Sequence, residues 1–156
     1  MWRIYYKMRK AIIIYPNNEA DEINLSLKNL SEEAKKLLGA DHLGGLGLNH
    51  FNGEYKLTLF CDDDFERKQL EPNNMASLIC CSGRYADRFQ YDAYLCGPCI
   101  VLNEDGDDLK DLSGDEFADI YSRCVDMKEE DKGVRGILKT GGLAPDFVRR
   151  SYDQRE

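Results

Sequence analysis

The chain has 156 residues, of which 42% are hydrophobic and 32% charged, and its formal net charge at pH 7 is −8. This length and composition are typical of a single domain that folds around its own core without metals or disulfides. The longest apolar run, Ala11–Tyr15, is far shorter than the roughly 18–20 residues that a membrane-spanning helix needs. The negative charge also argues against general nucleic-acid binding, because affinity for phosphates depends on basic surface.

The first elements can be read from local patterns. Residues 10–16 are a β-branched run ended by proline and predict a buried strand. A short helix follows, with Ser31 as its N-cap and Gly39 as its left-handed C-terminal residue. Asn52-Gly53 stands between two alternating runs and predicts a hairpin with a two-residue type I′ turn. Beyond it, alternation places Tyr55, Leu57 and Leu59 on one face of the strand and Lys56 and Phe60 on the other.

The second half adds one short helix, one strand and one long helix. Asn73 or Asn74 caps the short helix, and Ile100–Leu102 predict the strand. Ser113 and Glu116 form the pattern of a capping box, and Cys124 falls on the apolar stripe of the helix that follows. We therefore predict an α+β fold with a mostly antiparallel sheet of four or five strands, covered on one face by two helices.

The chain also divides by composition. Residues 1–9 are a basic N-terminal extension, with Met8 as an alternative start to Met1, and residues 10–131 form the single domain. Residues 132–156 contain four glycines and predict a partly ordered tail. The six cysteines favour free thiols in a reducing cytoplasm over a disulfide framework.

The tetrapeptide Cys96-Gly97-Pro98-Cys99 is identical to the active-site motif of thioredoxins. In those proteins the first cysteine lies at the N-terminus of a helix, whose dipole lowers the pKa of its thiol. Here a strand is predicted directly after the motif, and the acidic residues beyond it would raise the pKa of a thiol. We therefore predict a tight turn and keep thiol chemistry at Cys96 and Cys99 as an alternative.

No other pattern predicts a reaction centre. Cys80-Cys81 is a poor second ligand pair for zinc, because adjacent side chains do not readily converge on one tetrahedral ion. The acidic stretch 103–108 fails as a calcium loop, because aligning Gly106 with the central EF-hand glycine puts Val101 and Leu112 where oxygen ligands are needed. We therefore expect no metal site and no cofactor.

Acidic residues are concentrated in one segment. Residues 100–131 contain twelve acidic and three basic residues, a local charge of −9. Such a block either forms a solvated face or attracts a partner with a basic surface. On the second interpretation, the candidate partner-binding residues are Asp105, Asp107, Asp108, Asp111, Asp115 and Glu116.

An arginine- and aromatic-rich stretch supplies an alternative ligand site. Its candidate residues are Arg84, Tyr85, Arg88, Phe89 and Tyr91, which have the chemistry to stack on and pair with a nucleotide or another small ligand. Aromatic residues at this density are also typical of a core or a sheet surface, so both interpretations stay open.

The order of these motifs resembles a family of small domains of unknown function from phages, plasmids and other mobile elements. The resemblance covers roughly residues 10–125 and rests on the first strand, Pro72-Asn73-Asn74, Gly97-Pro98 with its following strand, and the acidic helix 113–120. It implies that Gly97-Pro98 is the family's turn and that the flanking cysteines are additions of this chain. The family has no established activity, so the resemblance implies no catalytic residues.

Together these observations favour a small acidic accessory protein of a virus or mobile element, without enzymatic activity, in the host cytoplasm. We expect it to bind a host or viral protein with a basic surface, and to modulate or inhibit that protein or a nucleic-acid-handling complex. Direct contact with nucleic acid or membrane is not expected, and a homodimer stays open. The alternatives are thiol–disulfide exchange and small-ligand binding at the residues named above.

Overall fold

The computed structural model describes residues 8–82, 95–106 and 108–130. Along these residues the elements are β1 (Met8–Ile14), β2 (Ala20–Ser26), α1 (Leu30–Leu38), β3 (Leu43–His50), the 3₁₀ turn η1 (Phe51–Gly53), β4 (Tyr55–Asp62), α2 (Asn74–Ser82), β5 (Cys99–Asp105), β6 (Asp108–Lys110) and α3 (Gly114–Glu130). The predicted α+β class with a mostly antiparallel sheet is confirmed.

The six described strands form one twisted, open sheet in which every pair of neighbours is antiparallel. Across the sheet the order is β2-β1-β5-β4-β3. The short β6 pairs with the end of β5 on the side away from β4, because Asn103 faces Leu57 on one side and Lys110 on the other. The sheet thus has one strand more than the four or five expected, and β2 at one edge was not predicted.

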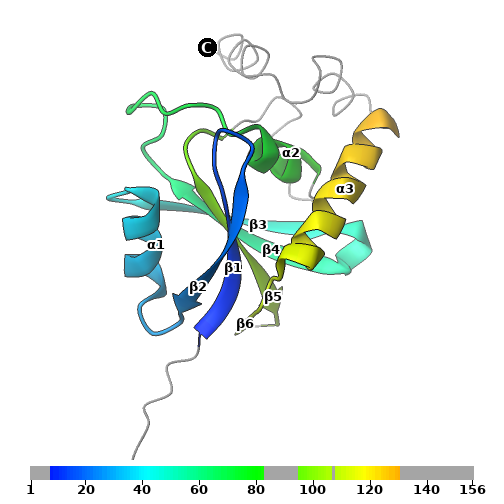
Figure 1. The fold of residues 1–156 in the computed structure, drawn as a ribbon, viewed down its shortest axis with the longest axis horizontal. Coiled ribbons are helices and arrows are strands. Elements are labelled where there is room, and N and C mark those ends of the chain that lie inside the picture. The colour runs from blue at the N-terminus through cyan, green and yellow to red at the C-terminus, as the bar shows by residue number, and fades with distance from the viewer. Residues whose placement is uncertain (1–7, 83–94, 107, 131–156) are drawn as a thin grey trace, which may run out of the picture.

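Helices cover both faces of the sheet, with α1 on one face and α2 and α3 on the other (Figure 1). The central strands require this arrangement, because the runs 11–14 of β1 and 99–102 of β5 are buried on both faces. Ile12 and Ile14 pack against α2 and α3, whereas Ala11 and Ile13 pack on the side of α1. The expectation of two helices on one face was therefore wrong.

The predicted helix ends are largely observed. The backbone N–H of Glu116 donates to Ser113 Oγ at 3.1 Å, and that of Ser113 donates to Glu116 Oε1 at 3.2 Å, which confirms the capping box. Gly39 ends α1 in the left-handed conformation, with φ of 64°. Helix α1 begins two residues earlier than expected, so its N-cap is Asn29 and not Ser31.

The predicted hairpin joins β3 and β4, but its connection has four residues instead of two, because His50 pairs with Tyr55. Asn52 and Gly53 adopt positive φ as predicted, and Phe51 does so as well, at 54°. Arg123 of α3 lies over the Phe51 ring, with the guanidinium carbon 3.9 Å from the ring centroid, and holds this longer loop against α3.

The first strand reaches further toward the N-terminus than the sequence pattern indicated. Met8 and Arg9, which composition assigned to the extension 1–9, belong to β1 and pair with Ser26 and Leu25. Residues 1–7 and the predicted tail 132–156 lie outside the described residues.

Candidate functional site

The Cys96–Cys99 motif forms a turn that feeds a strand, as the sequence predicted. Cys96 makes an isolated antiparallel bridge with Pro72, and Cys99 is the first residue of β5. Gly97 between them has φ of 79°, and a Cβ on it would lie 2.6 Å from Leu70 Cδ1. Glycine is therefore required here by both backbone conformation and space.

A buried asparagine holds this turn in place. Asn73 is fully buried, and its Nδ2 donates to the carbonyls of Ile14 and Gly97 at 2.8 and 2.9 Å. Its Oδ1 accepts the N–H of Ala76 and so caps α2. One side chain thus joins the end of β1, the start of α2 and the turn, which is a structural role that explains the residues around the motif.

The thiols of the motif lack the environment that thiol exchange requires. Cys96 is 5% exposed and Cys99 is not exposed. The element that directly follows the motif is the strand β5 and not a helix. Burial, with smaller contributions from the thiols of Cys61, Cys80 and Cys96, raises the pKa of Cys99 well above its ordinary value of 9. A nucleophilic cysteine needs a lowered pKa and access to its substrate, so the raised pKa argues against Cys99 as a nucleophile and burial limits access to both thiols.

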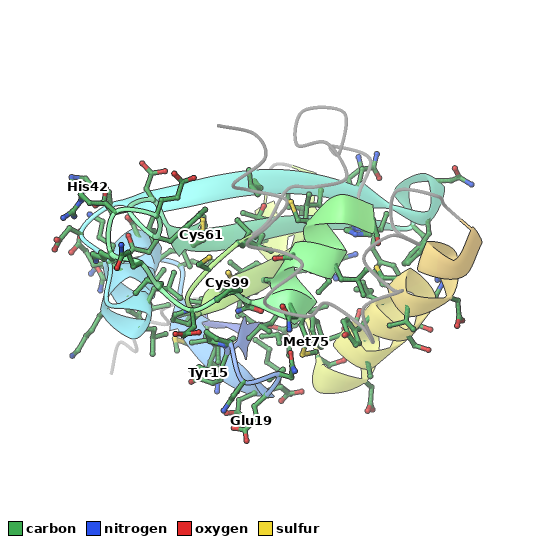
Figure 2. The ribbon with its side chains drawn as sticks, turned by 90° about the horizontal axis from the view of Figure 1, so that it is seen from above. Tyr15, Glu19, His42, Cys61, Met75 and Cys99 are labelled. Atoms are coloured by element: carbon green, nitrogen blue, oxygen red, sulfur yellow. The ribbon has the colours of Figure 1, made fainter. Side chains whose placement is uncertain are left out.

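The neighbouring cysteines belong to the same apolar core. Cys61 and Cys99 lie in the interior of the molecule, in contrast to the peripheral His42 and Glu19 (Figure 2). Burial raises the pKa of Cys61 to about 11 and that of Cys80 to about 12, so both thiols stay protonated near pH 7. Among the residues that the structure describes, no group of three or more His, Cys, Asp or Glu side chains could hold a metal ion.

The second candidate site is an acidic end, which we define as Asp105, Asp108, Asp111 and Asp115. These residues come from the β5–β6 hairpin, from the segment that leads into α3 and from the first turn of α3, and all four are exposed. Arg9, Lys10 and Lys110 lie in the adjoining strands, yet none of the four carboxylates makes an ion pair with a described residue. Among the described residues, no basic side chain therefore neutralises their charge.

Two of the predicted partner-binding residues do not contribute in the same way. The carboxylate of Glu116 takes part in the capping box, where Oε1 accepts hydrogen bonds from both the N–H and the hydroxyl of Ser113. Asp107 lies outside the described residues. The structure instead adds Glu22 of β2, whose Oε2 accepts the N–H of Gly114 at 2.6 Å. The contact of Glu22 with Gly114 could not be predicted from a local sequence pattern, because the two residues are 92 positions apart in the chain.

The acidic end contains a like-charged pair. Asp105 and Asp108 are directly opposite each other in the register of β5 and β6 and close the hairpin. Directly opposed like charges destabilise an antiparallel pair of strands. Asp108 Oδ1 accepts the N–H of Leu109 at 2.8 Å, which fixes this side chain without neutralising it.

A polar cluster that sequence did not predict joins the β3–β4 hairpin to α3. Arg123 forms ion pairs with Glu54 at 2.9 Å and Asp119 at 3.6 Å, and the Tyr55 hydroxyl donates to Asp119 Oδ2 at 3.0 Å. These groups satisfy one another, so the cluster fixes the hairpin against α3. The alternative ligand residues Arg84, Tyr85, Arg88, Phe89 and Tyr91 lie outside the described residues.

Comparisons of the chain with protein-family models, curated proteins and solved structures found no match. The described part of the chain contains no helix that is both long enough and apolar enough to cross a membrane. The candidate sites therefore have to be judged on their own geometry.

Proposed function

We propose that the chain is a non-enzymatic protein-binding module that presents its acidic end to a basic surface of another protein. In keeping with the resemblance to mobile-element domains, the partner would be a host or viral protein, and binding would modulate or inhibit it or a nucleic-acid-handling complex that contains it.

The observation that carries this proposal is the opposed pair Asp105 and Asp108 at the tip of an exposed hairpin. The pair costs stability in the isolated chain, and no described base offsets it. A cationic surface placed on the hairpin would remove this repulsion and form ion pairs at the same time. Such surfaces act chiefly on the rate of association and on partner choice.

The burial of Cys96 and Cys99 argues against the thiol-exchange alternative, because both thiols are enclosed and the pKa of Cys99 is raised. No observation favours the small-ligand alternative, because its candidate residues lie outside the described residues. The acidic end is the candidate whose charge is exposed and has no ion-pair partner among the described residues.

The test is a quantitative affinity purification from host lysate with three forms of the chain. One is the wild type, and one carries isosteric amides at the acidic end (Asp105→Asn, Asp108→Asn, Asp111→Asn and Asp115→Asn). The matched control removes the same number of charges at exposed positions elsewhere (Glu19→Gln, Asp41→Asn, Asp63→Asn and Asp126→Asn).

We expect a partner that the wild type and the control retain equally and that the acidic-end variant loses by at least about tenfold at low salt. Each amide preserves the side-chain shape and keeps one acceptor oxygen, which at position 111 can still accept the N–H of Lys10. Equal recovery of every protein by the acidic-end variant and the control would refute the proposal.

A further inference from the structure

Strand β3 forms one edge of the sheet. It pairs with β4 along all eight of its residues, and no described residue pairs with its other side. An edge of this length presents a row of backbone N–H and C=O groups to which another strand can bind.

The two edges of the sheet differ in how they are protected. Strand β2, at the opposite edge, carries exposed Asp21 and Glu22. Strand β3 has the sequence LGGLGLNH and contains no Asp, Glu, Lys, Arg or Pro. Charges and prolines are the usual means by which proteins prevent pairing at an edge. Of the β2 and β3 edges, the β3 edge is therefore the one that lacks this protection.

Two of the three glycines in β3, Gly45 and Gly47, have no steric explanation among the described residues. A Cβ on Gly44 would lie 3.1 Å from Cys61 Sγ, whereas a Cβ on Gly45 would make only ordinary contact, 3.7 Å from atoms of the Phe60 ring. A Cβ on Gly47 would meet nothing within 4 Å, and its φ is outside the left-handed region. Glycine lowers strand stability, and in a strand it often marks a place where another backbone approaches closely.

We propose that β3 pairs antiparallel with β3 of a second copy of this chain, around a two-fold axis at Leu46. In this register Gly45 lies opposite the partner subunit's Gly47, and Gly44 lies opposite the partner subunit's Leu48. The pairing is isologous, so the same seven residues, 43–49, supply both sides and the two sheets become one.

Charge favours this orientation. One end of β3 lies beside Asp62 of β4, followed by Asp63 and Asp64, and the other end lies beside Lys56. Asp62 and Asp64 already pair with basic side chains, whereas exposed Asp63 and exposed Lys56 make no ion pair with a described residue. Antiparallel pairing puts the Asp63 end of each copy alongside the Lys56 end of the other. It separates the two Asp63 ends by six residues, about 20 Å along the strands, which exceeds the Debye length of about 8 Å at physiological salt.

The test is sedimentation equilibrium of three forms of the full chain up to about 100 µM, since a single strand pair is a small interface. They are the wild type, Gly47→Lys, and Asn24→Lys as a matched control on the exposed β2 edge. The space around Gly47 accommodates lysine in the monomer, and thermal unfolding at low concentration verifies that each variant folds.

We expect the wild type and Asn24→Lys to rise from 17.9 kDa toward twice that mass with one dissociation constant, and Gly47→Lys to associate at least tenfold more weakly. A wild type that stays monomeric throughout would overturn the proposal, as would equal association of Gly47→Lys. Slow hydrogen exchange, at the lowest concentration, of those β3 amides that do not donate to β4 would also overturn it, because another part of the chain would then cover the edge.

Discussion

The opposed carboxylates of Asp105 and Asp108 should destabilise the isolated chain by a measurable amount. Side chains directly opposite in an antiparallel pair have Cβ atoms about 5 Å apart, and such pairs change stability by about 0.2–1 kcal/mol. Two unit charges about 6 Å apart in water repel by about 0.7 kcal/mol, which lies within that range. The substitutions Asp105→Asn and Asp108→Asn remove the charge and keep an oxygen that can accept the N–H of Leu109.

The assay is a double-mutant cycle, measured by urea unfolding at about 10 mM and about 1 M salt. Each single substitution removes the whole pairwise repulsion, so each should raise the free energy of unfolding, and the double variant should gain less than the sum of the two. The cycle cancels the general effect of lowering the net charge of −8. Additive effects at low salt, or a coupling that persists at about 1 M salt, would refute the reasoning.

Further predictions concern the buried groups and the long helix. Burial lowers the pKa of His50 below its ordinary 6.5, so the unfolded chain takes up a proton first as the pH falls. Stability should therefore be lost below pH 6.5, by about 1.4 kcal/mol for each pH unit that the folded pKa lies below that value. Unfolding of the wild type and His50→Gln between pH 7.5 and 5.5 measures this, and parallel curves would contradict it. Ser113→Ala should destabilise the chain by about 1 kcal/mol through loss of the α3 cap, whereas an unchanged midpoint would show that the capping box adds nothing. Cys96 and Cys99 should react with iodoacetamide at pH 7.5 about a hundredfold more slowly than after unfolding in urea, and equal rates would restore the thiol-exchange alternative.

Elements with local signals were predictable from the sequence. The capping box of α3 needs only Ser113 and Glu116, and the left-handed end of α1 needs only Gly39, so both predictions were correct. Strand β2 was missed because its alternating apolar pattern consists only of Ile23 and Leu25, which pack on the side of α1, while Asp21, Glu22 and Asn24 are exposed. Two apolar residues are too few to establish a strand period.

The placement of the helices was wrong although a signal for it existed. The continuous apolar runs of β1 and β5 are typical of strands buried on both faces, and a sheet buried on both faces needs cover on both. The turn at Gly97-Pro98 was predicted from the strand that follows it, and the structure agrees. The approach of Asn73 to Ile14 and of Glu22 to Gly114 depends on tertiary packing, which no local pattern encodes.

The most direct test of the central claim compares stability and affinity in one variant. Once a partner has been captured by the wild type, calorimetry should show that Asp105→Asn/Asp108→Asn binds it more weakly while unfolding at higher urea than the wild type. That opposite response is expected only if the repelling carboxylates are retained for binding. Affinity equal to that of the wild type, with the gain in stability intact, would contradict the account.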